Sequence, residues 1–254
     1  MALSIHTNYS ALTTNTALNK SNNALATNQQ RLGTGLRINS AADDAAGLQI
    51  ATRLNAQSRG MGVAMRNTGD ATSMLQTAEG AFSEMTDIVQ RMKDLATQAA
   101  NGTNSGDDLA ALHAEYDALG EEIGNIMDNT KYAGETLFTG GKFAAAVNFQ
   151  IGASSAEVMT VNVADKLTTL TTNLGTAKTV DLEAASDNTA AAETGAALAI
   201  VELDTVLNDL GSLRADFGAN INRLNHTSNN LANMKDNTEM AKGRIMDADF
   251  MFAK

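Results

Sequence analysis

The sequence contains no cysteine, no proline and no tryptophan, and aromatic residues make up only 4% of its 254 residues. The absence of cysteine excludes disulfide frameworks, thiolate metal sites and cysteine nucleophiles. The absence of proline permits long uninterrupted helices, because proline breaks helix interiors. The three histidines lie far apart and in no HExxH spacing, so no histidine-based metal site or catalytic triad is expected.

The formal net charge is −11. This charge argues against binding to nucleic acid or to anionic membrane surfaces. No apolar run reaches the roughly 18 residues that a membrane span requires, and the N-terminus lacks the features of a secretory signal peptide. We therefore expect no nucleic-acid partner, no membrane partner and no cofactor.

The first forty residues carry a thin apolar pattern. Leu18, Leu25 and Leu32 recur at seven-residue intervals, beside a polar column. This pattern predicts a helix whose apolar seam requires a partner, and a flexible polar leader is the open alternative. Gly33 and Gly35 are expected to interrupt the helix. The S-x-x-D spacing of Ser40 and Asp43 then predicts a new helix near residue 41.

Three longer segments show the alternating three- and four-residue spacing of a sustained helical seam. The first covers 71–99, and the second, 109–126, follows the turn NGTNSG. The third covers 196–241 and places Arg214 in the seam, where it either has a partner or extends its charged end to solvent. The seam residues are Leu75, Phe82, Met85, Val89 and Met92 in the first segment, Leu112, Tyr116, Leu119 and Ile123 in the second, and Leu207, Phe217, Ile221 and Leu224 in the third.

These seams predict a mainly α fold, a long antiparallel coiled-coil-like helical rod with a small β-hairpin. The predicted regions are an N-terminal helix in 1–40, the first part of the rod in 41–142 and a hairpin in 143–165. A short variable loop region in 166–195, the second part of the rod in 196–247 and a stub in 248–254 follow. Alternating apolar residues in 147–151 and 159–163 predict the hairpin, with a loop of about six residues.

No motif predicts catalysis. The adjacent carboxylates Asp43–Asp44, Asp107–Asp108 and Glu121–Glu122 point about 100° apart on a helix, so they form no acid–base pair. We expect them to be solvated or to cap helices. The glycines of GTG at 33–35 and GG at 140–141 lack the setting of a phosphate loop and are interpreted as turn residues.

A second face is present on the first long seam. Ile88, Arg91 and Leu95 lie on one side of the helix, separate from the seam, with Gln90 beside them. The residues alone leave two interpretations open: this face packs on another helix of the same chain, or it contacts a partner.

Several segments resemble the signature of bacterial flagellins. They include LGTGLRINSAADDAAGLQIATRLNAQ, IVQRMKDLATQAANGTNS, the turn TLFTGG, and RADFGANINRLNHTSNNLANMKDNTEMAKGRIMDADF. The resemblance covers roughly 1–142 and 196–250. It implies a structural, non-enzymatic subunit that polymerises into the extracellular filament of the bacterial flagellum for motility.

The resemblance also implies partners. These are other flagellin subunits, the flagellar type III export apparatus, the filament cap and junction proteins, and the vertebrate innate receptor for flagellin. By resemblance, the receptor and inter-subunit contact face carries over to Gln90, Arg91, Leu95 and Glu115, next to Ile88. Leu18, Leu25 and Leu32 become the seam of a filament-core helix.

Flagellins continue past the DADF motif into a C-terminal helix that pairs with the N-terminal one, whereas this sequence stops at Lys254. We therefore expect impaired docking of an export chaperone. Two alternatives to a polymerising subunit follow: a hook–filament junction protein, or an assembly-defective flagellin that persists as a soluble monomer.

Overall fold

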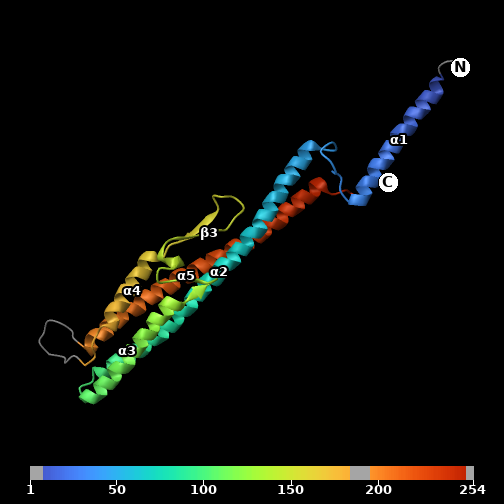
Figure 1. The fold of residues 1–254 in the computed structure, drawn as a ribbon. Coiled ribbons are helices and arrows are strands. Elements are labelled where there is room, and N and C mark those ends of the chain that lie inside the picture. Colours follow the sequence, from blue (N-terminus) through green and yellow to red (C-terminus); the bar gives the residue numbers. More distant parts are fainter. Residues whose placement is uncertain (1–7, 184–194, 250–254) are drawn as a thin grey trace. The chain divides into compact units, whose positions relative to one another are not determined.

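The structure is a computed structural model that describes residues 8–183 and 195–249. Its described part is mainly helical (Figure 1). The helices are α1 (Tyr9–Thr34), α2 (Ala45–Ala99), α3 (Gly106–Asn129), α4 (Ala164–Lys178) and α5 (Ala196–Met246). The strands are β1 (Lys131–Tyr132), β2 (Glu135–Thr136), β3 (Val147–Gln150) and β4 (Val158–Val161), and a 3-10 turn, η1, covers Lys142–Ala144. The predicted fold class, mainly α with a small β-hairpin, is confirmed.

The chain divides into two compact units. Unit 1 comprises residues 1–62 and 232–254, and unit 2 comprises residues 63–231. Both α2 and α5 contribute to each unit, because the division falls within these two helices.

Four helices pack together in unit 2. Ion pairs join Lys93 to Asp204 and Glu79 to Arg214, so α2 and α5 run antiparallel. The helix α4 runs antiparallel to α5 in the same way, through Lys166–Asp216 and Asn173–Asp209. The α3 helix contacts both α2 and α4, through Arg91–Glu115 and through a hydrogen bond from the Tyr116 hydroxyl to the Ala177 carbonyl.

The predicted seams form the core of unit 2. Leu75, Phe82, Met85, Val89 and Met92 are fully buried, as are Tyr116, Ile123, Phe217 and Leu224. The other seam residues, Leu112, Leu119, Leu207 and Ile221, are partly buried against the same core. Of the two alternatives for Arg214, the structure has the partner, because the guanidinium lies 3.3 Å from a Glu79 carboxylate oxygen.

A cluster of phenylalanines lies at the centre of this core. The ring of Phe82 lies 4.7 Å from that of Phe138 and 5.5 Å from that of Phe217, measured between ring centroids. Phe143 adds a further contact to Phe217, at 5.1 Å. The segment between β2 and β3 supplies Phe138 and Phe143, so this short segment is fastened to α2 and α5.

The predicted hairpin is confirmed. Strands β3 and β4 pair antiparallel, with Val147 opposite Val161 and Gln150 opposite Val158. A second hairpin, β1–β2, was not predicted. The two glycines after it are turn residues, as expected: Gly140 has φ of +60°, and a Cβ on Gly141 would lie 2.2 Å from the Thr136 carbonyl oxygen.

The prediction of a loop over 166–195 is wrong for its first part. Residues 164–178 form α4, and Leu167, Leu170, Leu174 and Ala177 on one of its faces are buried in the core. Residues 184–194 of the predicted loop lie outside the described residues. Between the end of α4 and residue 184, Val180 and Leu182 are buried in the core, and they anchor this segment to unit 2.

The predicted helix start near residue 41 is also wrong, because α2 begins at Ala45. The Asp43 carboxylate accepts hydrogen bonds from the backbone N–H groups of Asn39 and Ser40, which closes a turn before the helix. Asp44 then caps α2, because its carboxylate accepts from the Gly47 N–H at 2.8 Å. The expectation that these carboxylates are solvated or cap helices is confirmed, because Asp43 is exposed and Asp44 caps α2.

Candidate functional site

The first candidate surface is α1 in unit 1. This 26-residue helix begins after Asn8, whose side-chain oxygen accepts from the Ala11 N–H, and ends at Gly35, which adopts φ of +72°. The expected interruption by Gly33 and Gly35 is confirmed at Gly35, whereas Gly33 lies within the helix, which continues through Thr34. Five threonine hydroxyls of α1 donate to backbone carbonyls one turn back, as Thr14 does to Ser10. These hydroxyl groups therefore find their hydrogen-bond partners within the helix itself.

No residue of α1 is buried. Its leucine seam is open, with 57% of Leu18, 57% of Leu25 and 65% of Leu32 exposed. Tyr9 and Leu12 are exposed as well. Helices of this size in proteins gain most of their stability from packing an apolar face, and within the described residues this face packs on nothing.

Unit 1 is closed by backbone pairing between segments from the two halves of the sequence. Leu36 and Asp247 form an isolated antiparallel bridge. The Arg37 N–H donates to the Met246 carbonyl at 2.7 Å, and its guanidinium donates to the Ile245 carbonyl at 2.9 Å. These carbonyls belong to the last turn of α5, where a cation is favoured by the helix dipole.

The rest of unit 1 has few buried residues. Ile38, Ala51, Ser58 and Met61 are its buried side chains among the described residues. The Ser58 hydroxyl donates to a Glu239 carboxylate oxygen at 2.8 Å, which joins α2 to α5. This hydrogen bond, followed by the charge of Lys235, lowers the pKa of Glu239.

The second candidate surface is the predicted contact face on α2 and α3. Gln90, Arg91 and Glu115 are exposed, as expected. Arg91 donates to one carboxylate oxygen of Glu115 from both Nε, at 3.0 Å, and Nη2, at 2.7 Å. The two helices therefore present a paired cation and anion at the surface of unit 2.

The structure corrects this face at Leu95 and Ile88. Only 1% of Leu95 is exposed, and it belongs to the hydrophobic core of unit 2. Ile88 is partly buried against the same core. Of the two interpretations left open, packing within the chain holds for the apolar residues, while the polar residues beside them stay accessible.

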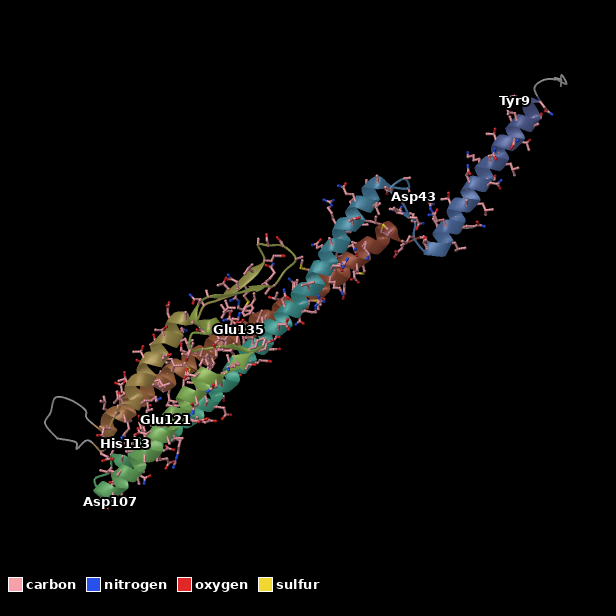
Figure 2. All side chains as sticks on the ribbon, viewed as in Figure 1. Tyr9, Asp43, Asp107, His113, Glu121 and Glu135 are labelled. Atoms are coloured by element: carbon pink, nitrogen blue, oxygen red, sulfur yellow. The ribbon has the colours of Figure 1, made fainter. Side chains whose placement is uncertain are left out.

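One end of α3 carries well-defined local polar contacts. Ser105 and Asp108 form a reciprocal capping box, and this hydrogen bonding lowers the pKa of Asp108. Further along α3, His113 Nε2 lies 3.5 Å from Asp117 and 3.9 Å from Asp181 (Figure 2 labels His113). In the described ranges, no group of three or more histidine, aspartate or glutamate residues is arranged to hold a metal ion.

Open grooves occur in each unit. One, of about 300 Å³, is lined in unit 2 by Asn67, Asp70, Ala71 and Met74 of α2 and by Tyr132 and Phe149. Another is lined by the last turns of α5 in unit 1, including Asp236, Met240 and Arg244. Neither of these two grooves brings a nucleophile next to a base among its lining residues.

The apolar faces of the long helices pack on one another in unit 2, whereas the apolar face of α1 in unit 1 is open. These features define a mainly helical structural protein. Two family models match the chain. The bacterial flagellin N-terminal helical region matches residues 5–142, and the bacterial flagellin C-terminal helical region matches residues 198–254.

Individual relatives agree with these models. Flagellin A of Vibrio anguillarum is 35% identical over an alignment that covers 98% of this chain and 90% of that protein. Flagellin C of Vibrio cholerae is 48% identical over 65% of this chain and 43% of its own length, so that match spans less than half of the relative. A crystal structure of Bacillus cereus flagellin superposes with a TM-score of 0.53 at 35% identity, and covers 65% of this chain and 88% of that one.

The chain belongs to the bacterial flagellin family. As a flagellin it is a structural subunit of the flagellar filament, which lies outside the cell. Both matching models are flagellin models, which favours this interpretation over the hook–filament junction protein. Within residues 8–183 and 195–249, no helix is long and apolar enough to cross a membrane.

Proposed function

We propose that the subunit polymerises through unit 1, with the leucine seam of α1 covered by helices of other copies in the filament. The observation that carries this proposal is the open seam of Leu18, Leu25 and Leu32 on a helix without a buried residue. A seven-residue apolar repeat is the pattern of helices that pack side by side. Unit 2, by contrast, buries its own seams and acts as the preformed body of the subunit.

The test replaces the seam leucines by glutamate, as Leu18→Glu, Leu25→Glu and Leu32→Glu together. We expect filament growth from seeds to be lost, because each glutamate places a charge in a contact from which water is excluded. The measurement is sedimentation with negative-stain imaging.

The matched control is Thr16→Glu, Asn23→Glu and Gln30→Glu, which adds the same charge to the opposite face of α1. This control should still form filaments, and equal loss in both variants would contradict a seam-specific contact. If the unaltered chain remains monomeric with seeds, the assembly-defective interpretation holds instead.

A second candidate role concerns recognition. We propose that Gln90, Arg91 and Glu115 form a surface that contacts neighbouring subunits in the filament and the vertebrate innate flagellin receptor when the subunit is free. The exposed Arg91–Glu115 pair supports this role, because a prearranged guanidinium and carboxylate can bind complementary groups with little loss of entropy. Export through the flagellar type III apparatus and contacts with the filament cap and junction proteins are also proposed, on the resemblance of the sequence alone.

The recognition proposal is tested with Arg91→Ala. We expect weaker activation of the receptor by monomeric protein, with little change in thermal stability, because an exposed ion pair contributes about 0.2–1 kcal/mol. Wild-type activation by a well-folded Arg91→Ala variant would contradict the proposed surface.

A further inference from the structure

The turn between α2 and α3 contains the one asparagine of the sequence that is followed by glycine, Asn101 before Gly102. The turn lies next to Asp107, in the first turn of α3 (Figure 2). Two further asparagines, Asn39 and Asn104, are followed by serine. A small following residue leaves its backbone nitrogen open to the preceding side chain. At these three positions the main chain can therefore attack the side-chain amide of an asparagine.

Hydrogen bonds hold Asn104 and the serine after it away from such a reaction. The Asn104 side-chain amide donates to the Gln98 carbonyl at 2.6 Å and to the Asn101 carbonyl at 2.9 Å. The Ser105 N–H donates to an Asp108 carboxylate oxygen at 3.0 Å. The amide that would leave and the nitrogen that would attack are both engaged with other groups.

Asn39 and its serine are held in the same way. The Asn39 side-chain amide donates to the Leu36 carbonyl at 3.1 Å. The Ser40 N–H donates to an Asp43 carboxylate oxygen at 2.9 Å. In both asparagine–serine pairs, hydrogen bonds thus fix the two groups that would have to meet.

Asn101 and Gly102 are not held in this way. Both residues are exposed. Within the described residues, neither the Asn101 side-chain amide nor the Gly102 N–H donates a hydrogen bond. A Cβ on Gly102 would meet no atom within 4 Å, so the space around this residue is open. The side chain and the following nitrogen are therefore able to approach each other.

We propose that Asn101 is a site of spontaneous modification, at which its side-chain amide is lost and aspartate or isoaspartate is formed. The Gly102 nitrogen gives up its proton to a base and forms a bond to Cγ of Asn101. The bond from Cγ to Nδ2 breaks, and Nδ2 takes up a proton and leaves as ammonia. Asparagine is among the residues most sensitive to heat in proteins.

Water then opens the cyclic imide at either of its two carbonyl carbons. The hydroxyl of the water goes to the carbonyl carbon, and its hydrogen goes to the Gly102 nitrogen. Cleavage at Cγ gives aspartate, and cleavage at the backbone carbonyl carbon gives isoaspartate. In sum, the reaction consumes one water and releases one ammonia, without oxidation or reduction. It requires only the folded monomer, so it does not depend on the proposed polymerisation.

The product changes both the charge and the main chain of the turn. The formal net charge goes from −11 to −12, and the new charge lies just beyond the C-terminal end of α2, where an anion is unfavourable. In isoaspartate, the main chain runs through the former side chain, and the former backbone carbonyl of residue 101 becomes a free carboxylate. In the structure this carbonyl accepts from the backbone N–H and the side-chain amide of Asn104. We therefore expect the modification to rearrange the turn.

The test is incubation of the folded chain in mildly alkaline buffer, followed by proteolysis and mass spectrometry. We expect loss of the amide at Asn101 to be about tenfold or more faster than at Asn39 or Asn104, because a misplacement of reacting groups by about 1 Å can cost about 100-fold in rate. Isoaspartate is detected by methyl transfer from S-adenosylmethionine, with a carboxyl methyltransferase that is selective for isoaspartate. Equal rates at the three positions, or no reaction at Asn101, would overturn the proposal.

Unfolding in urea separates the effect of the structure from that of the sequence. The hydrogen bonds at Asn39 and Asn104 are lost in the unfolded chain, so both positions should react faster there. The rate at Asn101 should change by less than about threefold, because the folded turn leaves its reacting groups unhindered. If Asn101 accelerates in urea as strongly as Asn104 does, the folded turn protects it and the proposal is wrong.

Two variants of the folded chain act on opposite sides of this comparison. Gly102→Ala adds a methyl group beside the attacking nitrogen, in open space, and should slow the reaction at Asn101 about tenfold with unchanged melting by circular dichroism. Asp108→Ala frees the Ser105 N–H and should raise the rate at Asn104 without affecting Asn101. An unchanged rate at Asn101 in folded Gly102→Ala would contradict attack by the Gly102 nitrogen.

Discussion

Unit 2 and unit 1 use similar helical sequence patterns but satisfy them differently. The seams of unit 2 meet one another, and a continuous core from Ala71 to Leu224 includes the phenylalanine cluster around Phe82. The seam of α1 meets no partner within the described residues. Few described side chains of unit 1 are buried, and the Ser58–Glu239 hydrogen bond joins α2 to α5 there. An apolar repeat therefore shows that a helix has a partner, but not whether this partner belongs to the same molecule.

The largest effect that would test this comparison is expected from Phe82→Asp. It removes an aromatic ring at the centre of the unit 2 core and leaves a buried carboxylate. Loss of a buried phenylalanine alone costs about 3–5 kcal/mol, and the buried charge adds to this cost. We expect collapse of the cooperative thermal transition, measured by circular dichroism.

The matched substitution in unit 1 is Leu25→Asp. Since 57% of Leu25 is exposed in the isolated chain, we expect the monomer to melt as before. A large loss of stability from Leu25→Asp would show that the α1 seam is packed within the monomer. Unchanged melting of Phe82→Asp would contradict the assignment of the unit 2 core.

A smaller effect distinguishes the two sides of the second face. Leu95→Ala should destabilise the monomer by about 2–5 kcal/mol, because it leaves a cavity in the core. The neighbouring Arg91→Ala should change stability by less than about 1 kcal/mol. The free energy of unfolding, measured in urea, checks both; equal small effects would mean that Leu95 lies at the surface. A double Arg91 and Leu95 variant is therefore unsuitable as a probe of recognition.

The smallest expected effect is a loss of stability in acid. Hydrogen bonds from the backbone of Ser40 and Asn39 lower the pKa of Asp43 below its ordinary value of 3.8, and those from Ser105 lower the pKa of Asp108 likewise. A carboxyl group whose pKa is lowered by folding stabilises the folded state when the pH is above its ordinary, unfolded pKa. This contribution is lost as the pH falls through the pKa of the folded state.

The melting temperature should therefore fall as the pH drops below about 4, and Asp43→Asn should show a smaller decrease than the unaltered chain. Thermal melts at a series of pH values give the comparison. An equally steep decrease in the variant would mean that Asp43 does not hold the turn before α2.

The sequence predicted the long elements well, because a repeat sustained over many turns admits few alternatives. It failed where local and tertiary effects compete. Helix α4 has the correct spacing at Leu167, Leu170 and Leu174, but the segment is short and rich in threonine, which disfavours helices. In the structure its threonines donate to carbonyls one turn back, as Thr168 does to Ala164, while its leucines are buried in the core.

The exposed polar residues of the proposed contact face were predicted from the sequence, but the burial of its apolar residues was not. Arg91 and Glu115 were expected at an exposed face, and the structure adds that they form an ion pair with each other. Leu95 lies on the same stretch of α2 but is buried, because the contact between helices covers more of α2 than one apolar stripe. Only the arrangement of α3 and α4 around α2 and α5 decides which residues remain accessible.

The pairing of Gly35–Arg37 with residues 245–248 has a kinetic consequence. The hydrogen bond from Arg37 to Ile245 spans 208 positions of the sequence, and contacts between such distant residues carry the highest entropic cost of loop closure. During synthesis from the N-terminus, residues 245–248, which pair with the end of α1, are made only after the whole of unit 2. In the folded protein, the hydrogen bonds between residues 35–37 and 245–248 need little free energy to open, since few buried groups support them. The first segment made is thus the last to be secured and the first to be released.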